Sequence, residues 1–414
     1  MKWIYRIGVF LARIFLALGA LFSPKLNHFL SGRNNLFENL RQFKTQYPGR
    51  VAWFHVASLG EYEQARPVIS MLKDSRPSLQ VVVSFFSPSG YDHVIKKPQP
   101  EVNYITYIPL DSRANAMRFV NVLRPELAFF VKYDLWFEHI LALKEAKVPI
   151  FLFSASFRPD QNYFRSNGFF RSILVQFDYI FTQNRKSLDL LDTINYSNAS
   201  YTGDTRFDRV VETSNNPKSF PELGQWTAGY EVVVAGSVWQ EDMDLLIPRI
   251  NEMTNYRWII APHDLGVEQM NLWISQLERP VSRYSEWDRG QQVEIIIIDN
   301  IGMLSSLYQF AKIAYIGGAF GKGLHNILEP LGFAVPVVFG NLKKSAKFPE
   351  AEECKNLGCG FEVSSAEELK EIFEKLDQQG FYSQSVSSAR SWVKSNVGAA
   401  EKIVSMVNTL TSKS

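Results

Sequence analysis

The chain has only two cysteines, Cys354 and Cys359, among its 414 residues. They lie five positions apart beside lysine and glutamate, which matches neither a disulfide framework nor the paired spacing of a zinc site. This scarcity favours a reducing compartment. Hydrophobic residues make up 46% of the chain and charged residues 21%, a composition that excludes disordered and fibrous proteins and indicates packed domains.

An excess of positive charge is also missing from most of the chain. Residues 1–50 hold eight Lys/Arg and a single acid, Glu38, which leaves residues 51–414 with a net charge of −5. A general nucleic-acid-binding surface is therefore not expected. The basic N-terminal segment instead predicts local contact with an anionic membrane surface.

The N-terminal segment is apolar from Ile4 to Phe22 except for Arg6 and Arg13. A helix of about 19 residues would nearly cross a bilayer core of roughly 30 Å. Because Lys2, Arg6 and Arg13 lie close to one helical stripe, we favour an anchor in the membrane interface, with a spanning helix and a buried core helix as alternatives. Basic residues further along are expected to add attraction to anionic lipid, namely Arg33, Arg41 and Lys44.

The rest of the chain is too long for one core, so two domains are expected. Short β-branched or aromatic runs alternate with helical stretches, which is typical of repeated βα units and of sheets buried on both faces. The first set of expected strands is 51–56, 81–86, 105–109, 127–131, 150–154 and 179–182, and the second set is 231–235, 258–261, 294–299, 313–316 and 335–339.

These patterns predict an α/β protein with two Rossmann-like domains and an N-terminal anchor helix. The breaks at Asn215-Asn216-Pro217, Pro221 and Gly224 mark a linker. The expected division is residues 1–48 for the anchor and basic segment, 49–214 and 215–384 for the two domains, and 385–414 for a helix that could return to the first domain. Ligands are expected at the carboxyl ends of the strands, in a cleft between the domains.

The first expected strand leads into Ser58-Leu59-Gly60-Glu61. One interpretation is a capping box, in which the serine and glutamate side chains satisfy free amides at a helix start. The other is catalytic: Glu61 is a base kept ionised by the positive end of the helix dipole, and Gly60 lets substrate approach.

A glycine-rich stretch, Gly317 to Glu329, follows an expected strand in the second domain. It is neither a Walker A sequence nor GxGxxG, but it would offer backbone amides and a helix start to a phosphate. Glu329 would then accept hydrogen bonds from ribose hydroxyls. The alternative is a flexible turn in which Asn326 caps a helix.

The acidic sequence Asp242-Met243-Asp244 resembles a metal-binding DxD motif. It follows a strand and a Gly-Ser pair, where acids complement a helix start, so we favour capping and expect no obligatory metal. Of the six histidines, His55 is expected in the core, and only His263 and His325 follow strand ends in the second domain.

Taken in order, these motifs resemble the 3-deoxy-D-manno-octulosonic acid (Kdo) transferases of lipopolysaccharide assembly. The resemblance spans nearly the whole chain. It rests on the N-terminal apolar segment, Ser58–Glu61, Asp134-Leu135-Trp136, Gly203–Asp208 and the Gly317–Glu329 loop.

The resemblance implies a GT-B fold and an inverting, metal-independent transfer of Kdo from CMP-Kdo to a lipid A precursor, at the cytoplasmic face of the inner membrane. It requires no cofactor beyond the donor substrate. By carry-over Glu61 is the general base, Arg206 stabilises the leaving phosphate, and Asp134 is a third catalytic candidate. The donor is expected to contact residues of the second domain, namely Pro262, His263, Ile301, Gly302, Met303, Gly318, Asn326, Ile327, Leu328 and Glu329.

The chain departs from the family pattern at three positions. The family's Pro-Arg-His reads Pro262-His263 here, and Lys132 and Asp134 stand where two glutamates are usual. Two other functions stay open: a GT-B enzyme that uses another nucleotide sugar on lipid, and a non-catalytic membrane-bound scaffold.

Overall fold

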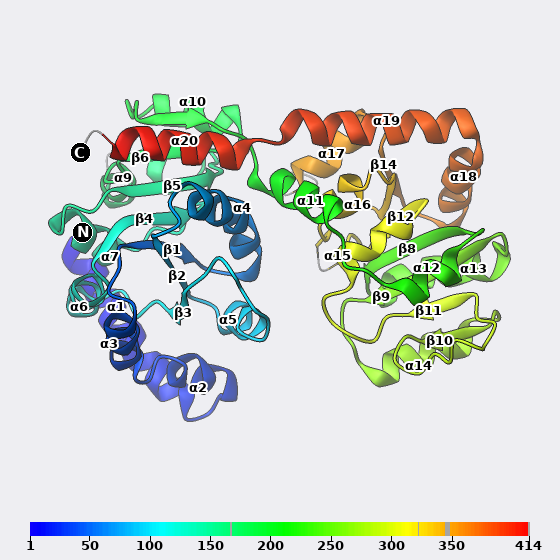
Figure 1. Cartoon of the computed structure of the whole chain (residues 1–414), viewed down its shortest axis with the longest axis horizontal. Coiled ribbons are helices and arrows are strands. Elements are labelled where there is room, and N and C mark those ends of the chain that lie inside the picture. The colour runs from blue at the N-terminus through cyan, green and yellow to red at the C-terminus, as the bar shows by residue number, and fades with distance from the viewer. Residues whose placement is uncertain (166–167, 322, 344–347, 413–414) are drawn as a thin grey trace. The chain divides into compact units, whose positions relative to one another are not determined.

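The computed structural model describes residues 1–165, 168–321, 323–343 and 348–412 (Figure 1). The chain divides into two compact units, residues 1–209 with 397–414 and residues 210–396. Each change of unit falls in or beside a helix, α11 (Thr205–Asn215) and α19 (Gln379–Asn396). The boundaries expected after residues 214 and 384 lie within these same two helices.

The first unit is built on a seven-stranded sheet of order β3-β2-β1-β4-β5-β6-β7, in which all neighbours run parallel. The order reverses between β1 and β4, so the loops that follow these strands leave toward opposite faces of the sheet. The strands are β1 (Val51–Val56), β2 (Gln80–Phe85), β3 (Tyr104–Tyr107), β4 (Pro125–Val131), β5 (Ile150–Ala155), β6 (Tyr179–Thr182) and β7 (Ala199–Tyr201). The sequence pattern predicted the first six strands and missed β7, whose three residues are only half-buried.

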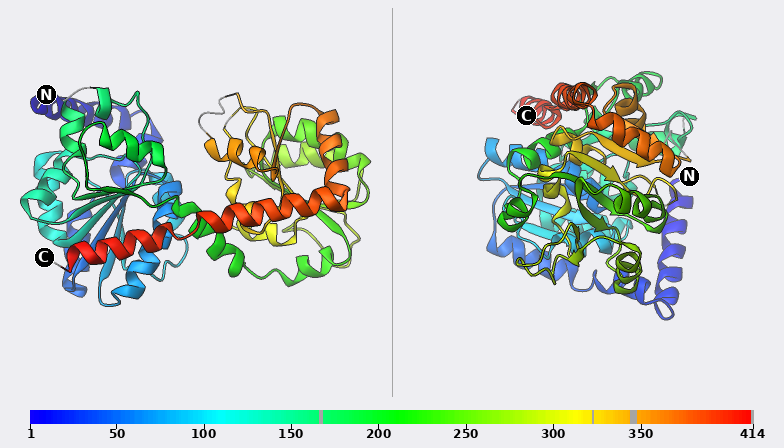
Figure 2. Two further views of the ribbon diagram at one scale, coloured as in Figure 1. Left: turned by 90° about the horizontal axis from the view of Figure 1, so that it is seen from above. Right: turned by 90° about the vertical axis from the view of Figure 1, so that its right-hand side faces the viewer.

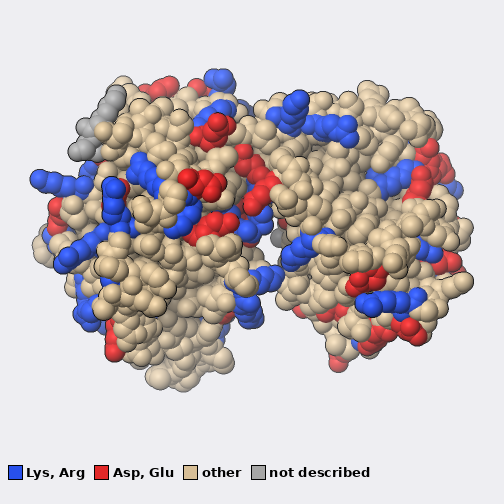
Figure 3. Space-filling view, in the orientation of Figure 1, with Lys and Arg blue, Asp and Glu red and all other residues tan. Residues whose placement is uncertain are grey.

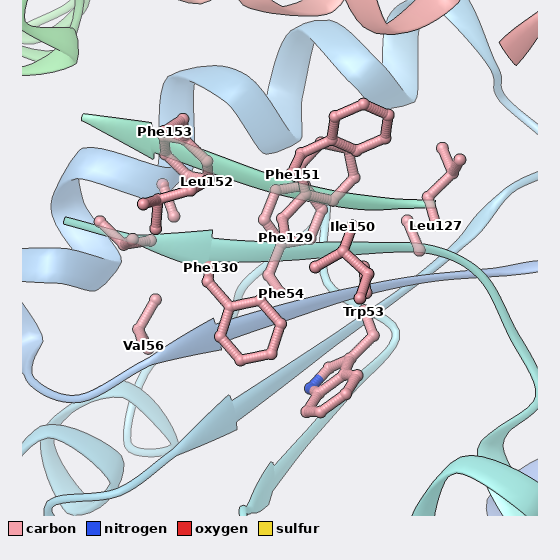
Figure 4. Packing of buried hydrophobic residues seen from close by; sticks show 14 of the residues in the cluster. Trp53, Phe54, Val56, Leu127, Phe129, Phe130, Ile150, Phe151, Leu152 and Phe153 are labelled. Carbon is pink, nitrogen blue, oxygen red and sulfur yellow. The ribbon is translucent and has the colours of Figure 1, made fainter. Parts of the chain in front are cut away.

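Aromatic side chains fill one face of this sheet (Figure 4). Phe54 on β1 stacks on Phe129 of β4 at 4.4 Å between ring centroids, and Phe129 stacks in turn on Phe151 of β5 at 5.3 Å. Trp53 points to the other face and is completely buried. Rings of this size bury enough apolar surface to hold the central strands rigid, and with them the loops at the carboxyl ends of the strands.

Helices cover both faces of the first sheet, and the last helix of the chain is one of them (Figure 2). This helix, α20 (Ala399–Thr411), packs on α4 (Leu59–Ser75). Its first turn is capped by the Asp208 carboxylate, which accepts hydrogen bonds from the amides of Gly398 and Ala400. The other helices after β1 are α5 (Pro88–Val94), α6 (Arg113–Leu123), α7 (Phe137–Glu145), α8 (Asn162–Arg165), α9 (Phe169–Leu174) and α10 (Arg185–Asp192).

Three N-terminal helices belong to the first unit: α1 (Lys2–Ala20), α2 (Pro24–Ser31) and α3 (Leu36–Gln46). The third contributes Leu36, Leu40 and Phe43 to the core of the unit. Residues 36–46 are therefore part of the folded domain, whereas the sequence placed them in a separate segment before it.

Two of the N-terminal arginines face the protein, although both were expected to face lipid. Arg6 Nε donates to the buried carboxylate of Glu138 at 2.6 Å, next to Tyr5, whose hydroxyl donates to the buried Asp111. The Arg33 guanidinium donates to the backbone oxygens of Phe29, Phe86 and Ile108. Both guanidinium groups therefore bind to the domain. A buried carboxylate or carbonyl oxygen is costly without a hydrogen-bond donor, and these arginines supply one.

The second unit repeats the architecture with a parallel sheet of order β10-β11-β9-β8-β12-β13-β14. Its strands are β8 (Glu231–Val238), β9 (Tyr256–Pro262), β10 (Val281–Arg283), β11 (Ile295–Ile297), β12 (Ile313–Ile316), β13 (Val337–Gly340) and β14 (Gly360–Val363). Its helices are α12 (Pro221–Thr227), α13 (Gln240–Glu252), α14 (Val267–Gln276), α15 (Leu304–Leu307), the 3-10 turn Tyr308–Phe310, α16 (Leu328–Gly332), α17 (Pro349–Asn356), α18 (Ala366–Asp377) and α19. The sequence pattern missed the short strands β10 and β14.

Charges of both signs are interspersed on the visible face of each unit (Figure 3). The face shown therefore offers no extended single-sign surface of the kind that nucleic-acid-binding proteins present.

Candidate active site

Glu61 lies in the first turn of α4, immediately after β1. The predicted capping box is not formed: Ser58 makes no side-chain cap bond, and Glu61 Oε2 accepts instead from the Ala57 amide at 2.6 Å. The carboxylate therefore bends back toward the end of β1. The capping interpretation is wrong for Ser58, whereas Glu61 does satisfy a backbone amide beside the helix start, that of Ala57.

The pKa of Glu61 is raised to about 7. Burial is the main cause, and the nearby charge of Asp134 adds to it, while the Ala57 hydrogen bond and the charge of Lys132 act in the opposite direction. The expectation that the helix dipole keeps Glu61 fully ionised is thus wrong, because desolvation outweighs it. A carboxyl group that titrates near neutral pH can accept a proton from a substrate hydroxyl.

Asp134 lies just beyond the end of β4, on a loop whose backbone is unusual. Lys132, which opens the loop, has a positive φ of 61°. Such a conformation is uncommon for a residue with a side chain and turns the chain sharply at the strand end. Asp134 Oδ2 accepts hydrogen bonds from His55 Nε2 at 2.9 Å and from Trp136 Nε1 at 2.8 Å. The structure thus brings Glu61 and Asp134 within electrostatic reach of each other.

Arg206 is held in a tight ion pair with Asp204 at the start of α11. Its Nε and backbone amide both donate to this carboxylate, at 2.8 and 2.9 Å, and Gln183 donates to it as well. An ion pair of this kind can also be purely structural. Asp208, the next acid along α11, caps α20 instead. The catalytic role of Arg206 stays a prediction.

In the second unit, Asp242 fastens the glycine-rich loop to the end of β8. Its buried carboxylate accepts from the amides of Trp239 and Gly318, at 2.8 and 2.9 Å, and from the Tyr315 hydroxyl at 3.0 Å. The Trp239 bond is the cap that the sequence predicted for Asp242. Within the described part of the chain no cluster of His, Cys, Asp or Glu could hold a metal ion.

The first glycines of the loop are required by space. A Cβ on Gly317 would lie 2.4 Å from the Ser237 carbonyl oxygen, and Gly318 has a φ of 93°. Their amides are already used, since Gly317 donates to Gly236 and Gly318 to Asp242. The amides of Gly317 and Gly318 are thus paired within the protein in this structure, and the expected contact of Gly318 with the CMP-sugar stays a prediction. Lys322 lies outside the described residues.

Three rings stack at the carboxyl ends of β8, β9 and β12. Trp239 lies 4.3 Å from His263, and His263 lies 4.5 Å from His325, with interplanar angles of 23° and 25°. Burial lowers the pKa of His263, and burial together with the neighbouring His263 lowers the pKa of His325 to about 4. Both imidazoles are thus uncharged at neutral pH. Trp239 was not identified from the sequence. The one signal that could have identified it is its position after the end of an expected strand.

The other residues expected to bind the CMP-sugar lie on three segments of the second unit. The Asn326 side chain accepts a hydrogen bond from the Leu328 amide and donates one to Glu329 Oε1, each at 3.2 Å. The bond from the Leu328 amide is the helix-capping contact that the alternative interpretation of this loop predicts. The loop of Ile301, Gly302 and Met303 turns at Gly302, where φ is 86°, and leaves the Ile301 side chain 69% exposed. Ile327, Leu328 and Met303 are buried, and Pro262 ends β9.

Comparison with solved structures shows which fold this is. A glycosyltransferase from Rickettsia africae is similar with a TM-score of 0.58 and 12% identity, covering 89% of this chain and all of that one. MurG from Acinetobacter baumannii is similar with a TM-score of 0.54 and 15% identity, covering 87% of this chain and all of that one. The two Rossmann-like units thus have the GT-B fold.

Comparison of sequences shows which proteins the chain is similar to. Residues 34–209 match the family model described as 3-deoxy-D-manno-octulosonic-acid transferase (kdotransferase). A 3-deoxy-D-manno-octulosonic acid transferase from Haemophilus influenzae is 24% identical over 349 residues, 81% of this chain and 80% of the relative. The one from Chlamydophila psittaci is 26% identical over 348 residues, 81% of this chain and 79% of the relative. Residues 34–209 thus match the Kdo transferase model, and the chain is similar to Kdo transferases over 81% of its length.

Proposed function

We propose that this protein transfers Kdo from CMP-Kdo to a sugar hydroxyl of the lipid A precursor lipid IVA, with inversion and without a metal ion. The single observation that carries the proposal is Glu61: a half-buried carboxyl group just after the first strand, with a pKa raised to about 7, within the residues that match the Kdo transferase model.

In this reaction Glu61 accepts the proton of the acceptor hydroxyl while the hydroxyl oxygen attacks the anomeric carbon of Kdo. The bond from that carbon to the phosphate oxygen of CMP breaks, and the electron pair leaves with CMP. Negative charge grows on the leaving phosphate, where a cation lowers the barrier most. Arg206 is our candidate for that cation. The glycine-rich loop, Glu329 and the stacked rings of the second unit would hold the nucleotide.

The test is the mass of the product after incubation of the purified full chain with CMP-Kdo and lipid IVA. We expect the acceptor to gain the mass of one or more Kdo residues, with and without a chelator. Transfer from a UDP-sugar in place of CMP-Kdo would indicate the alternative donor. Absence of transfer from either donor would support the scaffold interpretation.

We also propose that α1 anchors the protein in the interface of the inner membrane on its cytoplasmic side. Among the described residues, α1 is the helix that is long and apolar enough to cross a membrane, and none of its residues is buried. Its exposed apolar residues include Trp3, Phe10 and Phe15, each more than 60% exposed. Because Tyr5 and Arg6 tie the helix to the domain, an interfacial position is favoured over a spanning one.

A truncation and a double substitution test this anchor. Deletion of residues 1–23 should move the protein from the membrane fraction to the soluble fraction without unfolding either unit. Replacing Phe10 and Phe15 by serine should weaken binding to anionic vesicles while keeping the Tyr5 and Arg6 contacts. If the double variant stays as tightly membrane-bound as the wild type, the interfacial assignment of α1 is wrong.

A further inference from the structure

A continuous chain of hydrogen bonds runs through the first unit to Asp134. Trp53 Nε1 lies 2.8 Å from Ser84 Oγ, Ser84 Oγ lies 2.9 Å from His55 Nδ1, and His55 Nε2 lies 2.9 Å from Asp134 Oδ2. Trp53, Ser84 and His55 are completely buried, whereas the Asp134 side chain is 24% exposed. The chain therefore links the rigid interior of the sheet to a carboxylate at its edge.

The chemistry of these groups fixes where the hydrogens lie. The Trp53 N–H can only donate, so Ser84 Oγ accepts from it, and the Asp134 carboxylate can only accept, so His55 Nε2 carries a hydrogen. A neutral imidazole has one N–H, and its Nδ1 therefore accepts the hydroxyl hydrogen of Ser84. In this arrangement every donor of the chain meets an acceptor, and Ser84 selects the tautomer of His55 that faces Asp134.

Asp134 is thus held by hydrogen bonds, and its charge acts on Glu61. Its Oδ2 receives two N–H groups, from His55 and from Trp136. Among the described residues, these are the two hydrogen bonds that the Asp134 carboxylate accepts. The same carboxylate raises the pKa of Glu61 through its charge, and Lys132 is the charged group that opposes it.

We propose that His55 is a positioning residue: its Nε2–H holds the Asp134 carboxylate beside Glu61, and this fixed negative charge strengthens Glu61 as a base. The inference rests on the proposed role of Glu61 as the general base. It gives functions to a histidine that the sequence predicted to be an ordinary core residue and to an aspartate that was expected to be catalytic without a defined role. Negative charge near Glu61 favours its protonated form, which is the form it takes in the transition state.

The experiment is a titration of Glu61 by NMR of the carboxyl carbon in the full-length protein, with the signal assigned from its loss in Glu61→Gln. Asp134→Asn should lower the midpoint of the Glu61 titration by about one pH unit. His55→Leu should lower it in the same direction, because an unheld Asp134 can turn toward solvent. His55→Gln should recover part of the wild-type midpoint, since its amide can donate to Asp134, and Ser84→Ala should give a smaller shift than His55→Leu.

The first unit offers a matched control in its second buried histidine–aspartate pair. His139 is completely buried, and its Nδ1 lies 2.6 Å from Asp111, which it contacts without touching Asp134. His139→Leu should lose thermal stability as His55→Leu does but leave the Glu61 midpoint unchanged. An unchanged midpoint in His55→Leu as well would overturn the proposal. If His55→Leu does not fold, Ser84→Ala decides in the same way.

The titration needs no turnover, so it separates this inference from the proposed function. In an active enzyme, His55→Leu should lower kcat about tenfold, a part of what a general base contributes, leave the KM for the donor nearly unchanged, and move the acid limb of the pH profile to lower pH. If the Glu61 midpoint moves but no Kdo is transferred, the proposed function fails and the positioning of Asp134 is supported. If Kdo is transferred but the midpoint does not move, only the positioning role fails.

Discussion

The two units of this protein are both built on a seven-stranded parallel sheet, but they carry different chemistry at the carboxyl ends of the strands. In the first unit, titratable groups meet after β1 and β4, and the pKa of Glu61 is raised to about 7. In the second unit, a glycine loop and a stack of uncharged rings meet after β8, β9 and β12, and the pKa of His325 is lowered to about 4.

Burial acts on both sets of residues, and the sign of its effect depends on the group. It disfavours the charged form of each, so it raises the pKa of a carboxyl group and lowers the pKa of an imidazole. The first site can therefore exchange a proton near neutral pH, while the second stays uncharged. We infer that acid–base chemistry belongs to the first unit and nucleotide recognition to the second, and mutations should separate the two.

The largest effect is expected from Glu61→Gln. The substitution keeps the size of the side chain and an acceptor for the Ala57 amide but removes its basicity, so turnover should fall by about 10²–10⁴. The affinity for CMP, measured by calorimetry, should stay nearly unchanged, because the nucleotide is assigned to the other unit. Near-normal turnover would remove Glu61 from the mechanism.

Stability provides an independent control on Glu61. A carboxyl group whose pKa is raised on folding stabilises the folded state below its unfolded pKa, near 4.5, and this contribution is lost as the pH rises through about 7. The glutamine side chain has no such dependence. The melting temperature of Glu61→Gln should therefore gain on that of the wild type as the pH increases from acid to neutral and above.

The next effect is expected from Arg206→Ala, which should reduce kcat by about 10² if the guanidinium acts on the leaving phosphate. Donor affinity should fall much less, because the phosphate gains charge only as its bond breaks. Arg206→Lys should recover part of the rate. Asp204→Asn is the matched variant: it weakens the ion pair while keeping the arginine. If both variants retain full turnover, the pair is only structural, with a contribution of about 0–1 kcal/mol to stability.

Much of the fold could be predicted from the sequence, because parallel strands buried on both faces are runs of apolar residues. The runs that became β1, β4 and β8 are of this kind. Strands β7, β10 and β14 were missed, since each has only three or four residues and at least half of them are not fully buried. Short edge strands are defined by pairing with a neighbour, which a local pattern does not contain.

The candidate site could be predicted in its residues but not in its contacts. Glu61 and Asp134 follow strand ends, which is visible in the sequence. The bond from His55 to Asp134 joins residues 79 positions apart, and no spacing indicates it. Likewise, the carboxylate of Asp242 occupies the Gly318 amide only because β8 and β12 are neighbours in the sheet. Such contacts depend on tertiary packing.

A smaller effect is expected from Glu329→Ala in the second unit. Loss of hydrogen bonds from ribose hydroxyls to a charged acceptor should weaken CMP binding by roughly 1.5–3 kcal/mol. The pH at which turnover is half-maximal should not move, because this residue has no part in the proton transfer. Glu241→Ala, which removes an exposed carboxylate from the same unit, is the control for calorimetry. Equal affinities in the two variants would show that Glu329 does not contact the ribose.

The smallest effect is expected for the pH dependence of CMP binding in the absence of the sugar and the acceptor. Because burial keeps His263 and His325 uncharged, the affinity for CMP should be nearly constant between about pH 7 and 8.5, a range in which the phosphate keeps its second charge. Turnover, by contrast, should rise about tenfold from pH 5 to 6, reach about half of its maximum near pH 7 and level off above about pH 8, as Glu61 loses its proton. Calorimetry and steady-state kinetics on the same preparation test the pair of statements. An affinity that falls steeply as the pH rises through 7 would mean that the nucleotide binds a protonated His263, and the two units would then share the titratable chemistry that this comparison assigns to the first.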